Sequence, residues 1–404
     1  MARILLAWEL GTGFGHVAPL RALAQALTQR GHECVFAVRE LHTAEEFLQR
    51  GPWPVLQAPL RVSAIRAPLR VQVSYASLLH NTGFDDALNL AAMLRAWRDV
   101  MRISGCDLLV ADHAPCAVVA AHTLGLPTLQ LGSGFTLPPA TQPFPAFRPH
   151  PRLSDAVLQH NEQAVLAVLH EACERLEVAL PTTLQQIFAH TGRGLLTYAE
   201  LDHYEVRSGE RYLGLPDQAH GLSPPWPSGK GPRLFGYLRP SRHLQATLAA
   251  LARLNARVLV RIGGTDASKL RSFESLGLRI VDQAIDLREA ARDCDGFINY
   301  AAHGTTAEML LAGKPGVLLP DILERELVAK RAKQLGAALV LPSSGEFNLS
   351  EALRQLLEDP ALTKAAQGFA QRYASDDRTQ IMSALADRAL ALLKAPPRAA
   401  PAGA

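Results

Sequence analysis

The first forty residues run in the order strand, glycine turn, helix and strand. An apolar run at Ile4–Leu10 predicts a strand, Gly11–Gly15 predicts a tight turn, and Val17–Arg30 predicts a helix with apolar residues at helical spacing. A second apolar run at Cys34–Val38 predicts the next strand. Strands joined through a helix pair in parallel with a right-handed crossover, so this segment constrains the chain to a β-α-β unit.

The same order returns twice. In the first half, the predicted elements are Asp107–Ala111, Cys116–Leu124, Thr128–Leu131 and a long helical stretch, Asp155–Phe188, that breaks at Pro181. The pattern restarts at Arg257, with elements at Val258–Ile262, Gly296–Asn299, Thr306–Ala312 and Gly316–Leu319. Proline and glycine concentrate between the halves, as in exposed linkers. We therefore predict α/β domains at 1–222 and 233–380, a linker at 223–232, and a C-terminal helix with a frayed tail at 381–404.

Composition limits the partners that such a chain can have. With 404 residues and 48% hydrophobic side chains, it can bury two cores. Its net charge of +3 is too small for nucleic-acid binding to be the leading hypothesis, so we expect a small or neutral partner. Five scattered cysteines predict reduced thiols and a cytoplasmic location. No run reaches the roughly 18–20 apolar residues that span a bilayer. Peripheral membrane contact and oligomeric state stay open.

A histidine stands where the glycine turn enters the first helix. The turn lies where a GxGxxG dinucleotide fingerprint would lie, but His16 takes the third glycine position. Parallel sheets bind ligands at this edge, and the glycines allow a ligand to approach closely. A helix N-terminus disfavours imidazolium, so His16 is expected to stay neutral and accept a proton. The alternative is that His16 only caps the helix.

Asp112 is the predicted partner of this histidine. It ends the strand Asp107–Ala111, so in a parallel sheet it emerges at the same carboxyl edge as the glycine turn. A carboxylate that holds the second ring nitrogen of a histidine base stabilises the imidazolium that forms. An N-cap of the following helix is the alternative for Asp112. His113 beside it is an unresolved competitor.

The second half carries a predicted anion site at Ala302–Glu308. These residues follow an apolar strand and open a helix, where backbone N–H groups and two threonine hydroxyls suit a diphosphate. No GxxxxGK[ST] motif occurs, so a P-loop ATPase has no support. Glu308 lies where it can bind a ribose diol, or it is an ordinary helix-surface glutamate. Asp321 and Glu324 either grip sugar hydroxyls or form a loop salt bridge with Arg325.

Together, these motifs resemble the UDP-glycosyltransferase-like family, the GT-B glycosyltransferases that include macrolide, glycopeptide and plant natural-product glucosyltransferases. The opening from Gly15 to His32 is similar to the family's GHxxPxxxLAxxLxxxGH start. The stretch from Tyr300 to Arg325 is similar to its donor pattern, HGGxGTTxEALxxGxP…PxxxDQ. The likeness covers nearly the whole chain. It implies an α/β GT-B fold, two Rossmann-like doubly wound domains facing a cleft, with acceptor in 1–222 and nucleotide sugar in 233–380.

The resemblance also assigns roles to matching residues. His16 falls on the histidine that activates the acceptor hydroxyl, and Asp112 on its supporting aspartate, which implies an inverting transfer. Glu308 falls on the ribose-binding glutamate, and Glu324 on the sugar-contacting acid. UDP-sugar is the leading donor, TDP-sugar is second, and neither a metal nor a further cofactor is implied. The residues implied for the donor site are Gly15, Gly263, Gly264, Thr265, Ile285, Tyr300, His303, Gly304, Thr305, Thr306, Glu308, Glu324 and Arg325.

Three departures from the family pattern bear on the donor. Tyr300 replaces the diphosphate histidine, Ala301 and Ala302 replace a glycine pair, and Arg325 replaces a glutamine. Tyr300 can donate one hydrogen bond, His303 can take over the phosphate contact, and Arg325 favours an acidic sugar or the phosphates. The departures keep open a nucleotide-sugar-binding protein without activity. A nucleotide-sugar 2-epimerase is disfavoured by the GHxxP opening, and a dinucleotide oxidoreductase by His16.

The acceptor itself is not readable from the sequence. Its pocket is expected to come from the loops Pro59–His80 and Gly132–Arg148. The second loop carries Phe135, Phe144 and Phe147, which either contact an apolar aglycone or brace a proline-rich surface loop. Lipid, polyketide, terpenoid and glycan acceptors all stay open.

Overall fold

The computed structural model describes residues 1–48, 51–151, 153–179, 181–189, 191–205, 207, 209–217, 221–342 and 348–394. The chain forms two compact units. Unit 1 comprises Met1–Tyr198, Tyr204–Pro216 and the residues from Arg378 onward, and unit 2 comprises Ala199–His203 and Asp217–Asp377. The short segment Ala199–His203, which joins unit 2 from within the first half, was not predicted. The predicted frayed tail lies outside the described residues.

Unit 1 is built on a parallel sheet. Among its described residues the sheet has six strands in the order β3-β2-β1-β4-β5-β6. The strands are β1 (Arg3–Trp8), β2 (Glu33–Val38), β3 (Val55–Gln57), β4 (Leu108–Asp112), β5 (Thr128–Gly132) and β6 (Gly192–Leu195). The helices are α1 (Phe14–Gln29), α2 (Leu41–Leu48), α3 (Tyr75–Thr82), α4 (Ala87–Ser104), α5 (Pro115–Thr123), α6 (Asp155–Arg175), α7 (Leu184–Ala189) and α14 (Ile381–Lys394), with the 3₁₀ turn Arg378–Gln380 before α14.

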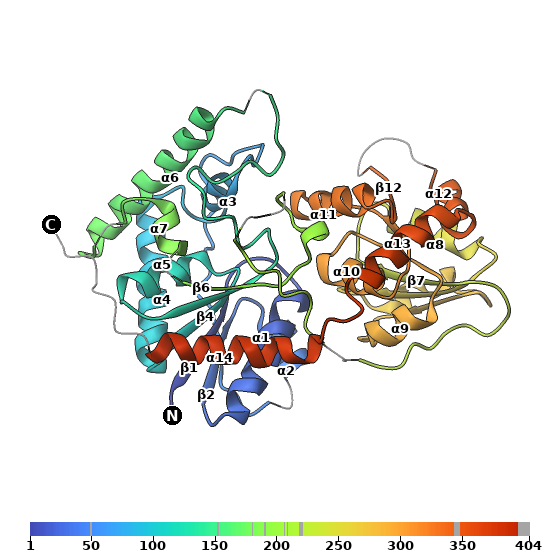
Figure 1. The fold of residues 1–404 in the computed structure, drawn as a ribbon, viewed down its shortest axis with the longest axis horizontal. Coiled ribbons are helices and arrows are strands. Elements are labelled where there is room, and N and C mark those ends of the chain that lie inside the picture. Colours follow the sequence, from blue (N-terminus) through green and yellow to red (C-terminus); the bar gives the residue numbers. More distant parts are fainter. Residues whose placement is uncertain are drawn as a thin grey trace. The chain divides into compact units, whose positions relative to one another are not determined.

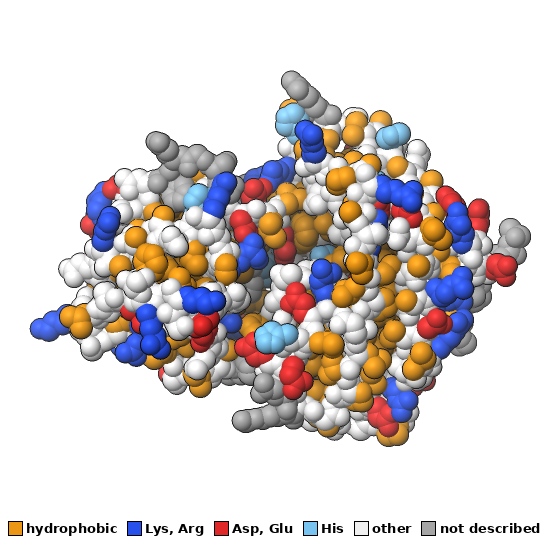
Figure 2. Space-filling view, turned by 180° about the vertical axis from the view of Figure 1, so that it is seen from behind, with side chains coloured by type: hydrophobic (Ala, Val, Ile, Leu, Met, Phe, Trp, Pro, Cys, Tyr) orange, Lys and Arg blue, Asp and Glu red, His pale blue; other side chains and the backbone are white. Residues whose placement is uncertain are grey.

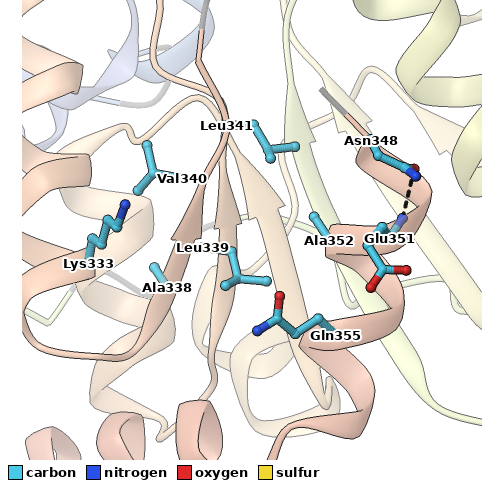
Figure 3. Close-up of a pocket in the computed structure, with 9 residues that line it drawn as sticks. All are labelled: Lys333, Ala338, Leu339, Val340, Leu341, Asn348, Glu351, Ala352 and Gln355. Carbon is cyan, nitrogen blue, oxygen red and sulfur yellow. Dashed lines mark hydrogen bonds between the residues drawn. The ribbon is translucent and has the colours of Figure 1, made fainter. Parts of the chain in front are cut away.

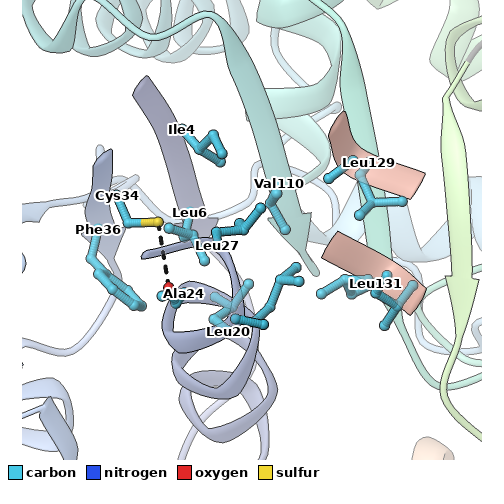
Figure 4. Close-up of a cluster of buried hydrophobic side chains, with 14 of the residues drawn as sticks. Ile4, Leu6, Leu20, Ala24, Leu27, Cys34, Phe36, Val110, Leu129 and Leu131 are labelled. Carbon is cyan, nitrogen blue, oxygen red and sulfur yellow. Dashed lines mark hydrogen bonds between the residues drawn. The ribbon is translucent and has the colours of Figure 1, made fainter. Parts of the chain in front are cut away.

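The core of unit 1 lies between this sheet and helices α1 and α14. Leu6, Val110 and Leu131 on the strands meet Leu20 and Leu27 of α1, all of them buried (Figure 4). Full burial of each such side chain stabilises the fold by about 1.5–3 kcal/mol. The predicted long helical stretch is broken, as expected, between α6 and α7.

Helix α14 returns to unit 1 and packs beside α1 (Figure 1). Glycines on strand β6 make room for it, because a Cβ on Gly192 would lie 2.9 Å from Leu392 and one on Gly194 would lie 2.7 Å from Leu385. Arg30, which follows α1 as its C-cap residue, donates to the Ser383 hydroxyl at 2.7 Å. The last helix is therefore part of the N-terminal core.

Unit 2 repeats the architecture. Its sheet has six described strands, all parallel, in the order β12-β11-β10-β7-β8-β9. The strands are β7 (Arg233–Leu238), β8 (Arg257–Ile262), β9 (Leu278–Val281), β10 (Gly296–Asn299), β11 (Gly316–Leu318) and β12 (Ala338–Val340). The helices are α8 (Leu244–Ala252), α9 (Leu287–Asp293), α10 (His303–Leu311), α11 (Leu323–Gln334), α12 (Leu349–Glu358) and α13 (Pro360–Arg372), and the 3₁₀ turns are Ala199–Leu201 and Ala267–Phe273.

Both units have the Rossmann strand order. Numbered within each unit, the strands read 3-2-1-4-5-6, the doubly wound order of dinucleotide-binding folds. In such sheets ligands bind outside the carboxyl ends of the strands, where the order reverses. The predicted pair of α/β halves is confirmed, and the reversal falls at β1 and β4 in unit 1 and at β7 and β10 in unit 2. None of the described helices is both apolar enough and long enough to cross a bilayer.

Candidate active site

His16 and Asp112 are hydrogen-bonded at the carboxyl edge of the unit 1 sheet. Nδ1 of His16 lies 2.9 Å from Oδ1 of Asp112. Asp112 is the last residue of β4 and is 3% exposed, whereas His16, in the first turn of α1, keeps 17% of its side chain exposed. The carboxylate accepts, so Nδ1 carries the proton and Nε2 is left with a lone pair. The two residues predicted from strand-end positions thus form one dyad.

The local sequence explains how this histidine is placed. Trp8 ends β1 in register with Asp112, and its indole stacks on the His16 ring with centroids 5.5 Å apart. The chain then turns through Gly11 and Gly13, whose φ angles of 85° and 87° favour glycine. A Cβ on Gly11 would lie 2.2 Å from Nε2 of His16, so this glycine also makes space for the ring. Trp8 was missed in the sequence analysis, although it ends a strand at the same edge.

The electrostatic surroundings of the His16–Asp112 dyad favour protonation of the histidine. Burial raises the pKa of Asp112, and the neighbouring His16 opposes that rise. A buried carboxylate has little water to solvate its charge, so it gains most when the adjacent imidazole becomes positive. The pair therefore favours proton uptake at Nε2 of His16.

Glu9 anchors the turn that carries Asp112. Its carboxylate is 2% exposed and accepts from the N–H groups of Cys116 and Ala117, at 3.0 and 3.2 Å, at the start of α5. Burial raises the pKa of Glu9 to about 7, and the hydrogen bonds from Cys116 and Ala117 oppose that rise. This anchor was also missed, since a single glutamate after a strand has no distinctive spacing.

In unit 2, the N-terminus of α10 presents backbone donors. The N–H of Thr306 donates to the carbonyl of Ala302, the first hydrogen bond of the helix. The N–H groups of His303, Gly304 and Thr305 therefore come before the regular hydrogen bonds of the helix. Ala302, the N-cap residue, makes no side-chain cap bond. Gly304 is exposed and Thr305 is 7% exposed. Partial positive charge gathers at such an end and attracts anions.

Two predicted donor residues face inward instead. Thr306 is fully buried, and its hydroxyl is bonded to the Asn299 side chain, with its Oγ1 3.2 Å from Asn299 Nδ2. Tyr300 is 6% exposed and joins the hydrophobic core. Its hydroxyl donates to the Arg239 carbonyl at 3.1 Å and bonds Ser241 at 2.7 Å. These side chains support the loop from within, and the ligand contacts expected of their hydroxyls stay predictions.

A charged cluster stands at the ends of β7 and β11. Asp321 bonds both Arg239 and Arg325, with the Arg325 contact at 2.8 Å. Of the two roles foreseen for Asp321, the salt bridge with Arg325 is the one formed. Glu324 lies in the first turn of α11 and is partly exposed. The cluster holds two arginines against one aspartate, and Arg239 was missed although it directly follows a strand.

The remaining predicted donor residues also lie in unit 2, except for one. Gly263, Gly264 and Thr265 follow β8, and the φ of Gly264 is 76°. Ile285 is 6% exposed and pairs with Leu222, just before the predicted linker. His303 contacts His203 with ring centroids 5.8 Å apart, and Glu308 is partly exposed on α10.

Gly15 is the exception, because it lies exposed in the first turn of α1 in unit 1. A Cβ on Gly15 would meet nothing within 4 Å.

The aromatic residues of the second predicted acceptor loop are buried. Phe135, Phe144 and Phe147 are 5%, 1% and 3% exposed. Phe144 packs edge-on against Tyr75, and Phe135 stacks on Phe147 at 5.1 Å. The bracing role left open for these side chains is the one that the packing supports.

A shallow pocket of about 260 Å³ lies elsewhere on unit 2 (Figure 3). It is lined by Lys333 near the end of α11, by strand β12 with Leu341 after it, and by Asn348, Glu351, Ala352 and Gln355 at or on α12. None of the predicted site residues lines it. Within the described ranges, no group of three or more His, Cys, Asp or Glu side chains is arranged to hold a metal ion.

Comparisons with known proteins agree with this geometry. The family described as erythromycin biosynthesis protein CIII-like, C-terminal domain, matches residues 245–386. A curated UDP-N-acetylglucosamine–N-acetylmuramyl-(pentapeptide) pyrophosphoryl-undecaprenol N-acetylglucosamine transferase of Desulfitobacterium hafniense is 27% identical over 242 residues, 53% of this chain and 63% of that protein. The match thus spans just under two thirds of this relative.

Two further matches run almost end to end. The PGL/p-HBAD biosynthesis glycosyltransferase of Mycobacterium tuberculosis is 23% identical over 404 residues, 93% of this chain and 89% of that protein. The crystal structure of glycosyltransferase VinC in complex with DTDP superposes with a TM-score of 0.69 at 18% identity, covering 97% of this chain and 99% of that one.

The fold is therefore that of the GT-B glycosyltransferases. In its C-terminal half the chain is similar to the erythromycin biosynthesis protein CIII-like family, and over nearly its whole length it is similar to a glycosyltransferase, in line with the family that its sequence motifs resemble.

Proposed function

We propose that this glycosyltransferase moves a sugar, with inversion, from a nucleoside diphosphate to a hydroxyl of a small-molecule or lipid acceptor. The observation that carries the proposal is the dyad. His16 is held by a buried carboxylate 2.9 Å away and presents Nε2 as a base. A base fixed in this way removes the proton of a hydroxyl as the oxygen begins to attack.

The reaction runs in one displacement. The acceptor proton passes to Nε2 of His16, and the acceptor oxygen bonds to the anomeric carbon from the face opposite the diphosphate. The bond between that carbon and the diphosphate oxygen breaks, and the leaving group takes the electron pair. Asp112 stabilises the new imidazolium, because the opposite charges then lie in contact within a buried site.

The donor site is proposed at the carboxyl edge of unit 2. Backbone N–H groups of His303, Gly304 and Thr305 would hold the diphosphate, since they precede the helical ladder of α10. Arg239 and Arg325 add positive charge nearby. Glu308 would bind the ribose and Glu324 the sugar. The loop Gly263–Gly264–Thr265 and Ile285 would flank the nucleotide.

A UDP-sugar is the leading donor and a TDP-sugar the second. The relative from Desulfitobacterium is named for a UDP-sugar, and the VinC crystal holds DTDP. Because Arg325, which is paired with Asp321, replaces the glutamine of the family pattern, the sugar-binding end of this site differs from the pattern.

The proposal requires no metal and no cofactor beyond the nucleotide sugar. We also propose a cytoplasmic protein that does not bind nucleic acid and that can contact a membrane surface. The free cysteines support the first point. Figure 2 supports the second, because acidic and basic side chains are interspersed over the face that it shows.

The test is a transfer assay with UDP-glucose and TDP-glucose against a panel of phenols, macrocyclic alcohols and long-chain alcohols. Mass spectrometry should find a product heavier by one hexose, and its proton NMR should show the anomeric configuration opposite to the donor's. A product with retained configuration would contradict the single displacement.

A nucleotide-sugar-binding protein without turnover is the second candidate. The inward hydroxyls of Tyr300 and Thr306 favour it, because they remove two side-chain contacts from the leaving group. Tight nucleotide binding without transfer, and without release of free sugar, would support this alternative.

A further inference from the structure

His113 follows the dyad aspartate and has an unusual backbone. Its φ is 46°, a left-handed conformation that is unfavourable for a non-glycine residue. The surroundings impose it, because the His113 carbonyl accepts from the N–H of Leu10 at 2.9 Å. Glu9 fixes the start of α5 just beyond. The turn therefore holds His113 in one orientation despite this cost.

The ring of His113 lies beside the base. Its centroid is 5.8 Å from that of His16, and 6.3 Å from that of Phe135, which meets it edge-on. Phe135 is buried, so the imidazole has an apolar wall on one side and the base on another. Burial, together with the nearby His16 and Arg39, lowers the pKa of His113 to about 3. The ring is therefore neutral at physiological pH.

One nitrogen of the His113 ring is not explained by contacts within the described part of the protein. Nε2 of His113 is buried and has no hydrogen-bond partner among the described residues. Leaving a buried polar nitrogen unpaired is unfavourable, because the nitrogen loses its hydrogen bonds to water and gains none in the protein. His113, next to the catalytic base, therefore carries two unfavourable contributions to stability: its backbone strain and its unpaired nitrogen.

We propose that Nε2 of His113 binds a second polar group of the acceptor, adjacent to the hydroxyl that His16 deprotonates. This inference rests on the proposed function, and it specifies the acceptor class as a molecule with neighbouring oxygens. Each imidazole nitrogen reaches an oxygen about 2.9 Å away, so oxygens bound to two rings this close belong to adjacent positions. An isolated alcohol would leave Nε2 unpaired.

Two isomeric probes test this class. Catechol has hydroxyls on adjacent carbons and hydroquinone has them across the ring, so the two match in composition. We expect the wild-type protein, without nucleotide, to bind catechol about fivefold more tightly in an NMR titration, the worth of one hydrogen bond of about 1 kcal/mol. His113→Phe keeps a ring and should bring this ratio to about one. Equal affinities in the wild type, or a ratio that survives His113→Phe, would overturn the proposal.

Stability separates this role from a structural one. His113→Phe removes an unpaired nitrogen and should leave the unfolding midpoint unchanged or higher. His170→Phe is the control, because Nε2 of His170 on α6 bonds the Pro181 carbonyl at 2.7 Å, so it should lower the midpoint and keep the isomer preference. A His113→Phe variant that is less stable than His170→Phe would contradict the proposal.

A second pair of variants covers a failure of the first to fold. His113→Gly relieves the φ strain, as does Glu177→Gly at an exposed residue with a φ of 52°. Both should fold at least as well as the wild type, and only His113→Gly should lose the isomer preference. Because the probes are titrated without nucleotide, a failure of nucleotide binding would reject the proposed function and leave this result standing.

Discussion

The two units share a strand order but differ in the polar groups at the carboxyl edges of their sheets. In unit 1 the polar side chains hold one another in place, because His16 is hydrogen-bonded to Asp112 and stacked on Trp8. In unit 2 the hydroxyls of Tyr300 and Thr306 form hydrogen bonds with other groups of the protein. One edge offers side-chain chemistry and the other offers backbone N–H groups with nearby arginines.

This difference matches what the two proposed ligands require. Proton transfer needs one nitrogen held in one place, so the base is fixed by several contacts. A diphosphate spreads its charge over many oxygens, and a helix N-terminus can bind it without any particular side chain. Substitutions at the two edges should therefore differ in kind as well as in size.

The largest expected effect separates the two edges directly. His16→Ala should lower the transfer rate by about 10³-fold, a typical loss for a general base, and leave nucleotide affinity nearly unchanged. Initial rates and calorimetric titration with UDP measure the two quantities. His42→Ala, at an exposed histidine of α2, is the control and should change neither. Parallel loss of rate and affinity would remove the distinction between the edges.

Glu9 should make the anchoring of the unit 1 edge visible in the pH dependence of stability. Its pKa is about 7 when folded, against 4.5 unfolded, so the folded state favours the protonated acid. The stability is fully present below pH 4.5 and falls by about 3 kcal/mol as pH rises through 7. Glu9→Gln should flatten this fall in denaturant unfolding measured from pH 4.5 to 8.

Glu45→Gln is the control for Glu9, because Glu45 is exposed on α2. It should follow the wild-type curve. If Glu9→Gln also follows that curve, Glu9 is not the group that titrates.

A smaller effect is expected at the donor edge. Glu308→Ala should weaken nucleotide binding by about 1–2 kcal/mol, the worth of hydrogen bonds to a carboxylate. Calorimetry with UDP gives the change, and Glu358→Ala on the surface of α12 serves as control. Unchanged affinity would mean that Glu308 is an ordinary helix-surface residue.

The smallest effect concerns the alanine pair that replaces the family's glycines. Ala301 has a φ of 57°, so Ala301→Gly should stabilise the protein by about 1 kcal/mol. Ala302 has a φ of −62°, and the matched Ala302→Gly should destabilise it slightly. Thermal unfolding compares the two. A stability gain from Ala302→Gly, or none from Ala301→Gly, would contradict the assigned strain.

Sequence patterns predicted the elements that carry strong local signals. The β-α-β order and the glycine turn placed β1, α1 and β2 within three residues at each end, and strand-end logic brought His16 and Asp112 to one edge. The three-residue strands β3 and β12 were not predicted, whereas β11, equally short, was, because so short a run carries little periodicity and is recognised only where its surroundings favour it. Likewise, no local pattern shows that Ala199–His203 joins unit 2.

Side-chain direction was the least predictable property at the donor edge. The motif aligned Tyr300 and Thr306 with ligand-binding positions, but their hydroxyls find partners within the protein. Tertiary partners such as Arg239 and Asn299 decide that choice, and they lie outside the motif's own matched positions.

The central claim is that unit 2 binds a nucleotide sugar, and a thermal-shift comparison tests it most directly. UDP, TDP, GDP and NAD are each added to the purified protein, together with UDP-glucose and TDP-glucose. A ligand that binds only the folded state at 100 times its Kd stabilises it by about 2.7 kcal/mol. We predict a raised melting temperature with the UDP or TDP compounds. A shift with NAD alone, or with none of them, would contradict the claim.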